Sequence, residues 1–387
     1  MNSSRIVIIL LFVTIIAVAG AILVLVREQA AISTDVESAR LFPDLGSRLG
    51  DVAEVRIEDA GNSVTIKRDG EGWTLPGKFG YPADQGRVRG ALLDATRIDL
   101  LEVRTADPAL YGRLGVQNPD QQGSRAVRLS LLDAGGGTLA AVLIGDRPQG
   151  SGVYSPDQRG GSGRAYVRRP DEIQSWLASG VPDLSADSEY WLNDQLLSLV
   201  QDRVKRVTVH HADGATIRIY RDSPGGDNGD DRFSIADLPD ERIARTADGP
   251  ATLAMGLAFL SFDDVKPADD VDWSGGSEVL FTAFDGLEIT VRLKDGWAHF
   301  SAVHDPAVAE EGDGRAVLPP SPPDGEAEAR RINERFGQWA YKLPAYKADD
   351  LVPGMDDLTM PSDAGPSDAG PLDGEAADGD QSMQKAP

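Results

Sequence analysis

The sequence predicts an α+β fold of antiparallel strands and a few helices, set behind one N-terminal membrane helix. Three observations predict it. From Asp51 onward, short runs alternate apolar and polar residues, as half-buried strands do. Stretches with apolar residues at helical spacing follow groups of these runs. Before all of them, Ile6 to Val26 is apolar throughout and carries no charge.

The N-terminal stretch Ile6–Val26 has 21 residues. A helix of that length spans roughly 31 Å, close to the thickness of the bilayer's hydrocarbon core. A cleaved secretory signal is the alternative, because Arg5 precedes the stretch and Ala17-Val18-Ala19 imitates a cleavage site. The stretch is longer than the apolar part of a usual signal peptide, which favours an uncleaved transmembrane helix over 6–26.

Within this helix, Ala17, Gly20 and Ala21 form a face of small residues on which another membrane helix could pack closely. Small residues also occur in apolar spans by chance, so these three are candidate partner contacts only. Arginines flank the helix on both sides, so the positive-inside rule does not decide its orientation. A short anchor ahead of a large polar region resembles a retained export signal, which favours a single-pass protein of the cell inner membrane with its C-terminal part in the periplasm.

The first expected module spans three strands and one helix. Its strands are marked by alternating apolar pairs: Val55 and Ile57, Val64 and Ile66, Trp73 and Leu75. Asp84 then fits a helix N-cap. It is followed by one apolar helical face: Val88, Leu92, Ala95 and Ile98. The pattern of apolar residues thus predicts a short sheet with a helix packed on one of its faces.

Similar strand starts recur near positions 52, 126, 204 and 278, at spacings of 74, 78 and 74. The regularity predicts tandem modules of about three antiparallel strands plus one helix, arranged as two similar halves. Further helices are expected from Asp171 (with Ile173, Trp176 and Leu177), after Asp248 (with Leu253, Leu257 and Leu260), and from Glu326 to Ala340. The predicted regions are a stalk at 27–50, a first α+β half at 51–182, a connector at 183–202, a second half at 203–352 and a disordered acidic tail at 353–387.

Composition limits the partners of this chain. The net charge of −24 and the pI near 4.5 argue against nucleic acid as a partner. The tail from Pro353 has eight acidic residues and one lysine, and almost no apolar residues. The chain has no cysteine, which leaves its redox compartment open.

The sequence contains no recognisable catalytic or metal-binding motif. His210 and His211 are neighbours on an expected strand and point to opposite faces, so they cannot chelate one metal together. The acidic loop around Asp222 to Asp231 lacks EF-hand spacing, and a solvated turn explains it more simply. The glycine-rich stretch Gly145 to Gly163 does not open a helix as phosphate loops do. We therefore expect no enzymatic activity, no cofactor and no metal.

Two tryptophans in connecting segments, Trp191 and Trp273, are candidate contacts for a ligand or partner. Aromatic rings serve such contacts when they are exposed. Burial as part of the packing between elements is the alternative for both. The candidate contact residues are therefore Trp191, Trp273, Ala17, Gly20 and Ala21.

Several short motifs occur in an order that resembles a known family. They are LFPDLGSRLGDVAEVRIE from position 41, FGYPAD from 79, LYGRLGV from 110, YVRR from 166, WLASG from 176 and WAYKLPAYKADDL from 339. In this order they resemble the family called domain of unknown function 4340, over about residues 41–351. The resemblance implies a single-pass envelope protein associated with an ABC-type export system of the gliding-motility kind. It implies no catalytic residues.

Two functions are therefore expected. The first is an accessory or interaction subunit of an ABC-type transport or envelope complex, held by its anchor beside the permease. The second is a binding module for envelope glycan or another extracytoplasmic ligand, using Trp191, Trp273 or the glycine-rich loop.

Overall fold

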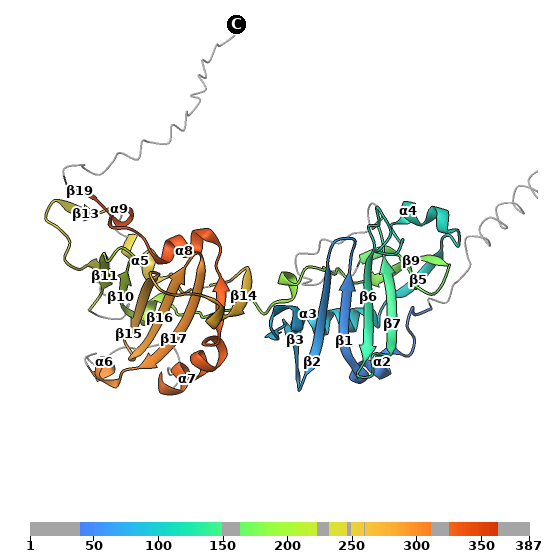
Figure 1. Cartoon of the computed structure of the whole chain (residues 1–387), viewed down its shortest axis with the longest axis horizontal. Coiled ribbons are helices and arrows are strands. Elements are labelled where there is room, and N and C mark those ends of the chain that lie inside the picture. The colour runs from blue at the N-terminus through green and yellow to red at the C-terminus, as the bar shows by residue number, and fades with distance from the viewer. Residues whose placement is uncertain are drawn as a thin grey trace, which may run out of the picture. The chain divides into compact units, whose positions relative to one another are not determined.

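The computed structural model divides the chain into two compact units, unit 1 ending at Asp194 and unit 2 beginning at Gln195 (Figure 1). The structure describes residues 39–148, 163–222, 232–245, 249–258, 260–310 and 325–362. Each unit contains one large antiparallel sheet with short helices, so the α+β class expected from the sequence is confirmed at that level.

Unit 1 is built on a nine-stranded sheet with the order β4-β3-β2-β1-β6-β7-β8-β9-β5. Its elements are α2 (Leu45–Arg48), β1 (Val52–Glu58), β2 (Ser63–Asp69), β3 (Gly72–Leu75), β4 (Tyr81–Pro82), α3 (Gln85–Ala95), β5 (Asp99–Val103), α4 (Tyr111–Leu114), β6 (Val127–Asp133), β7 (Thr138–Ile144), β8 (Gly163–Arg168) and β9 (Ser175–Val181). Alternate residues of β1 and β2 enter the core, with Ile57 and Ile66 fully buried.

Helix α3 begins where the sequence predicts. The Asp84 side chain accepts hydrogen bonds from the backbone N–H groups of Gly86 and Arg87, at 2.8 and 3.0 Å, and so caps the helix. Val88, Leu92 and Ala95 are buried on one face of α3, which packs against β3 and β9. The predicted cap and apolar face are confirmed.

Unit 2 is built on an eight-stranded sheet with the order β12-β11-β10-β15-β16-β17-β18-β14, beside a two-stranded sheet of β13 and β19. Its elements are β10 (Val204–His210), β11 (Thr216–Tyr220), β12 (Ser234–Ile235), β13 (Arg242–Ala244), α5 (Gly249–Ala254), β14 (Asp264–Pro267), β15 (Ser277–Ala283), β16 (Leu287–Lys294), β17 (Trp297–His304), α6 (Pro306–Glu310), α7 (Gly325–Phe336), β18 (Trp339–Lys342), α8 (Ala345–Leu351), α9 (Met355–Leu358) and β19 (Thr359–Pro361). Helix α7 packs on β16 and β17.

Of two helices expected from the sequence, the one from Asp171 is wrong and the one at 326–340 is shorter than expected. Ile173, Trp176 and Leu177 fit helical spacing, but residues 175–181 form β9 between β8 and β5. β9 buries residues on both faces, and such an apolar run cannot be told from a helix by periodicity. The helix expected at 326–340 ends at Phe336, because Trp339 and Ala340 pair with β14 as part of β18.

The remaining module predictions also need correction. The helix expected after Asp248 stops at Ala254, although Leu257 and Leu260 beyond it are buried. The first two predicted modules do not form separate sheets, because β1 pairs directly with β6. One large sheet per unit, and not one small sheet per module, therefore buries the apolar faces.

The ends of the described region also differ from the predicted stalk and tail. Leu41 and Leu45, assigned to the stalk, are buried in unit 1 at 1% and 3% exposure. At the other end, β19 pairs with β13, and Leu358 is buried. Order thus extends about ten residues into the predicted tail, and 363–387 lie outside the described residues. The predicted membrane helix 6–26 lies outside them too; within the described ranges, no helix has the length and apolarity to cross a bilayer.

Candidate functional site

The two tryptophans singled out from the sequence sit in different surroundings. Trp191 is 1% exposed, its indole N–H donates to the Ser185 carbonyl at 2.8 Å, and its ring meets Tyr190 edge-on. The ring therefore packs inside unit 1 and offers no surface to a ligand. Trp273 is half-buried, donates to the Ala268 carbonyl at 3.0 Å and lies 5.7 Å from the His299 ring. Ala17, Gly20 and Ala21 lie outside the described residues.

The histidines make separate structural contacts. The Nε2 atom of His299 lies 2.8 Å from the Gly337 carbonyl, and that of His304 lies 3.1 Å from the Asp285 carbonyl. His210 contacts the Thr216 hydroxyl. In the portions of the chain that the structure describes, no three His, Asp or Glu side chains gather where they could hold a metal ion.

Two of the motifs from the sequence meet at one end of the unit 1 sheet. The LYGRLGV motif forms α4 and the turn after it, where Gly115 has a φ of +66°. The Asp146 N–H donates to the Leu114 carbonyl at 2.9 Å, just beyond the end of β7. A Cβ at Gly145 would lie 2.2 Å from that carbonyl oxygen. Glycine at 145 thus permits the turn after α4 to cross β7 at backbone contact distance.

The YVRR motif completes this end through Arg168. Its guanidinium donates to the carbonyls of Val116, Pro170 and Glu172 and to Asn118 Oδ1, and it lies over the Tyr111 ring at 4.5 Å. Burial lowers the pKa of Arg168, and the interaction with Tyr111 opposes that shift. Because its acceptors come from two loops, at 116–118 and at 170–172, Arg168 holds these loops together.

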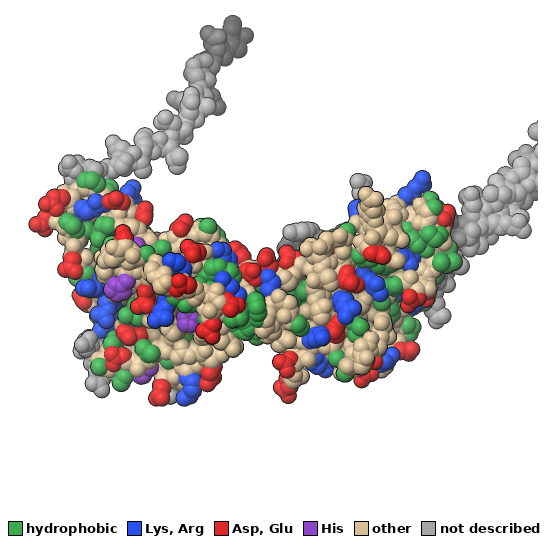
Figure 2. All heavy atoms as spheres, viewed as in Figure 1, with side chains coloured by type: hydrophobic (Ala, Val, Ile, Leu, Met, Phe, Trp, Pro, Cys, Tyr) green, Lys and Arg blue, Asp and Glu red, His purple; other side chains and the backbone are tan. Residues whose placement is uncertain are grey.

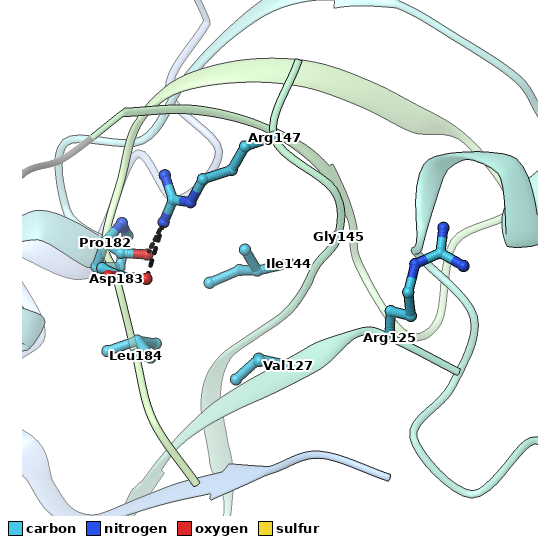
Figure 3. A pocket seen from close by; sticks show the side chains of 8 residues that line it. All are labelled: Arg125, Val127, Ile144, Gly145, Arg147, Pro182, Asp183 and Leu184. Atoms are coloured by element: carbon cyan, nitrogen blue, oxygen red, sulfur yellow. Dashed lines mark hydrogen bonds and ion pairs between the residues drawn. The ribbon is translucent and has the colours of Figure 1, made fainter. Parts of the chain in front are cut away.

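A small pocket opens beside this scaffold (Figure 3). It has a volume of about 160 Å³. The residues lining it come from the start of β6 and the segment before it, the end of β7 and the segment after it, and the segment after β9: Arg125, Val127, Ile144, Gly145, Arg147, Pro182, Asp183 and Leu184. In Figure 3, the apolar side chains of Val127, Ile144 and Leu184 approach one another, and the guanidinium of Arg125 points away from them.

The two arginines of this pocket differ in how fully they are paired. Arg125 makes a two-pronged contact with Asp146, which raises the pKa of Arg125 through hydrogen bonding and charge attraction. Arg147 donates through Nη2 to the Pro182 carbonyl at 3.0 Å and to Asp183 Oδ1 at 3.4 Å. The Nη1 atom of Arg147 is buried and has no hydrogen-bond partner. The Nη1 atom is therefore enclosed by protein atoms and is not exposed to the pocket.

This arrangement suits binding better than proton transfer or nucleophilic attack. Val127, Ile144 and Leu184 lie beside two arginines and one aspartate, and the lining holds no Ser, Cys, His or Lys side chain. Arg125, Arg147 and Asp183 were not predicted from the sequence, because they belong to no motif and lie far apart in the chain. The LYGRLGV and YVRR motifs form the scaffold beside the pocket. They are therefore the sequence signal that could have pointed to this region.

Charges elsewhere are mixed. On the face drawn in Figure 2, acidic and basic side chains are interspersed over both units, and neither kind forms a continuous patch there. A view of this face therefore singles out no surface for a strongly charged partner.

One comparison with known proteins gives a match. The model of the family described as "Domain of unknown function (DUF4340)" matches residues 73–272, just over half of the 387 residues. No curated protein and no solved structure matches the chain. The pocket residues, from Arg125 to Leu184, all lie within the matched span.

Proposed function

The chain belongs to the family described as domain of unknown function 4340, and from that premise we propose that it is a membrane-anchored accessory subunit of an ABC-type transport or envelope complex. The anchor is the stretch Ile6–Val26, and the two sheet units lie in the periplasm beside the permease. The role is interaction and not catalysis.

The observation that carries this proposal is the uncharged N-terminal stretch of 21 residues ahead of two folded units. An uncleaved apolar helix of that length is held in a membrane by the cost of exposing it to water. The resemblance of the ordered motifs to the family supports an ABC-type partner. The shared strand order of the two units supports the further proposal that they arose as two tandem, similar halves.

Co-purification from membranes tests this proposal. The full-length protein is extracted in mild detergent and captured through a C-terminal tag, and the associated membrane proteins are identified by mass spectrometry. We expect an ABC-type permease to be enriched. Capture of no membrane partner, or recovery of the full-length protein from the soluble fraction, would contradict the proposal.

A matched variant tests the role of the small-residue face. The double substitution Ala17→Leu and Ala21→Leu keeps the stretch apolar, so the protein should stay in the membrane. Close helix packing against the permease would be lost, since bulky side chains separate the two backbones. We expect permease recovery to fall several-fold, and the substitution Val24→Leu serves as the control within the same stretch.

A further inference from the structure

The last strand of the unit 1 sheet, β5, is paired on one side only over most of its length. β9 lies on its inner side. On its outer side, the segment at 39–41 pairs with its beginning: the Leu41 N–H donates to the Ile98 carbonyl at 2.8 Å, and the Leu100 N–H donates to the Ala39 carbonyl at 3.0 Å. Within the described part of unit 1, no segment pairs with the outer side of residues 102–104. A strand open in this way can accept another strand.

The other strands at the ends of the two large sheets are less open. Beside β4, the Asn193 N–H donates to the Pro82 carbonyl at 3.3 Å, so the connector covers this strand. In β14, the Asp264 side chain accepts from the Val265 N–H at 2.7 Å, and Pro267 has no N–H to donate. β12 has only two residues. β5 is therefore the best placed of these four strands to receive a partner strand.

The backbone of Val103 points toward this open side. The Arg104 N–H donates to the Ser175 carbonyl of β9 at 2.9 Å. Since the backbone groups of successive residues in a strand point to opposite sides, the N–H and C=O of Val103 point away from β9. The Val103 side chain is 55% exposed and lies beside the half-buried Trp176 of β9. A partner strand at Val103 would thus gain both backbone hydrogen bonds and apolar contact.

We propose that β5 pairs antiparallel with β5 of a second copy of this protein, about a twofold axis at Val103. In this register Val103 faces Val103 of the other copy, and Glu102 faces Arg104 in both directions. Glu102 and Arg104 already form an ion pair of 2.8 Å within one chain. Across the axis each charge gains a second opposite neighbour. The charge pattern is complementary to itself, which is why the occupant is a second copy.

The proposed pairing is short. The segment at 39–41 occupies the start of β5, and beyond Arg104 the Thr105 carbonyl accepts from the Ser175 N–H at 2.8 Å, so the chain stays with β9 there. Stable interfaces bury about 1,200 Å² or more, and a strand of this length buries less. The dimer is therefore weak in dilute solution, and its test must trap it. This inference concerns unit 1 itself and is independent of the membrane association proposed above.

Disulfide trapping is clean in this protein, because the chain has no cysteine of its own. Facing residues of a hydrogen-bonded antiparallel pair have Cα atoms about 5.5 Å apart, inside the disulfide range of about 4.4–6.8 Å. The purified full-length protein in detergent is oxidised gently and separated on a non-reducing gel. We expect Val103→Cys to give at least about fivefold more disulfide dimer than Val303→Cys, a control of similar exposure at 59% in unit 2.

The register is tested by two further cysteine variants. Two copies of residue 102 are out of register and lie about 7–8 Å apart, so Glu102→Cys alone should give little dimer. Mixing Glu102→Cys with Arg104→Cys should give the mixed dimer, since these positions face each other. No dimer with Val103→Cys, as expected if another part of the chain covers β5, would overturn the proposal. A Val103→Cys disulfide to a different co-purified protein, or equal dimer from Val303→Cys, would overturn it too.

Charge exchange separates contact between copies from contact within one chain. In the Val103→Cys background, Glu102→Arg and Arg104→Glu each place like charges side by side, and each should lower dimer yield by about fivefold. Mixing the two variants should restore the yield, because every charge then meets its opposite on the other copy. The like charges within each chain remain after mixing, so an effect within one chain cannot explain recovery. Circular dichroism establishes that both variants are folded, and a mixture that stays as low as its components contradicts the proposed pairing.

Discussion

Unit 1 and unit 2 follow one strand plan. Reading from β3 and from β12, the orders β3-β2-β1-β6-β7-β8-β9-β5 and β12-β11-β10-β15-β16-β17-β18-β14 match strand for strand. The pairing of β1 with β6 slips between Val52 and Glu54, and the pairing of β10 with β15 slips at the equivalent place, between Val204 and Arg206. β-Bulges are conserved within protein families, so their equivalent positions fit the proposal that the two units are similar halves.

The units differ most at one pair of strands. β16 and β17 pair at eight positions through a tight turn, whereas among the described residues β7 and β8 pair at two, Leu143 with Arg168 and Ile144 with Val167. The long connection in unit 1 begins where the turn of unit 2 begins, and Arg147 lies on it. The two units therefore share the order of their strands, while the extent of pairing between one pair of equivalent strands differs.

The largest expected effect tests this difference at two equivalent glycines. Gly136 and Gly286 both have a φ of +81° and donate to equivalent carbonyls, those of Asp133 and Ala283. A Cβ at Gly286 would lie 2.3 Å from the Asp305 carbonyl at the end of β17, while one at Gly136 meets nothing within 4 Å. We expect Gly286→Ala to cost about 3 kcal/mol or more and Gly136→Ala only about 1 kcal/mol.

Urea denaturation measures the change in the free energy of unfolding for each of the two variants. Hydrogen exchange of β6 and β15 shows which of the two units is destabilised. Equal losses of stability for the two variants would mean that the full-length β16–β17 pairing does not constrain the turn. The difference inferred between the two units would then be wrong.

An intermediate effect is expected at a second equivalent pair, Arg68 near the end of β2 and Arg221 directly after β11. Arg221 is 4% exposed, donates to the Val204 and Gln201 carbonyls at 2.9 and 2.6 Å and lies over the Phe233 ring. Arg68 is exposed, donates one hydrogen bond of 3.3 Å to the Gly50 carbonyl and lies over the Trp73 ring at 5.0 Å. Substitution by Met should cost about 2 kcal/mol at Arg221, where carbonyls lose buried partners, and under about 0.5 kcal/mol at Arg68.

Chemical denaturation of the two Met variants gives these differences directly. Arg221→Lys keeps the positive charge but loses the planar guanidinium. Its free energy of unfolding should lie between those of wild type and Arg221→Met. If Arg68→Met proves the more harmful variant, burial is not what distinguishes the two units at this position.

The smallest effect concerns Asp94 near the end of α3, the longer of the two equivalent helices α3 and α5. Burial raises the pKa of Asp94, and Arg97 partly opposes this. The folded state therefore keeps the proton to a higher pH than the unfolded state, so wild-type stability falls as pH rises through that window. Asp94→Asn should stabilise the protein at pH 7 by less than about 1 kcal/mol, since a carboxylate at a helix C-terminus is also unfavourable.

Denaturation midpoints of wild type and Asp94→Asn at pH 7 and pH 3.5 check the sign. The gain should disappear at the lower pH, where both chains carry an uncharged side chain. A gain that is the same at both values would assign the effect to side-chain packing and not to ionisation.

The local parts of the fold were predictable because their signals lie within a few residues of one another. Asp84 caps α3 through the next two peptide groups, and the alternation of Val55 and Ile57 needs only β1 itself. Trp176 and Leu177 misled because β9 buries residues on both faces and pairs with β5, a strand distant in sequence. Tertiary pairing there decided between two structures that the local pattern permits equally.

The pocket was not predictable for the same reason. Arg147 and Asp183 are 36 residues apart, and neither residue differs in sequence from an ordinary surface charge. What distinguishes Arg147 is one buried nitrogen, and that depends on how the segment after β9 passes the end of β7. Unpaired donors are properties of packing, so residue type and spacing do not reveal them.

The pairing of β13 with β19 bears on where a recombinant version of this protein should stop. Arg242 donates to the Thr359 hydroxyl and to Asp356, and Thr359 is fully buried. A chain truncated at Val352 would leave Ile243 and its neighbours as an unprotected strand edge, a recognised route to aggregation. Expression plasmids should therefore encode the sequence through Ser362. The backbone N–H of Ser362 donates to the Glu241 carbonyl and so extends the pairing of β13 with β19.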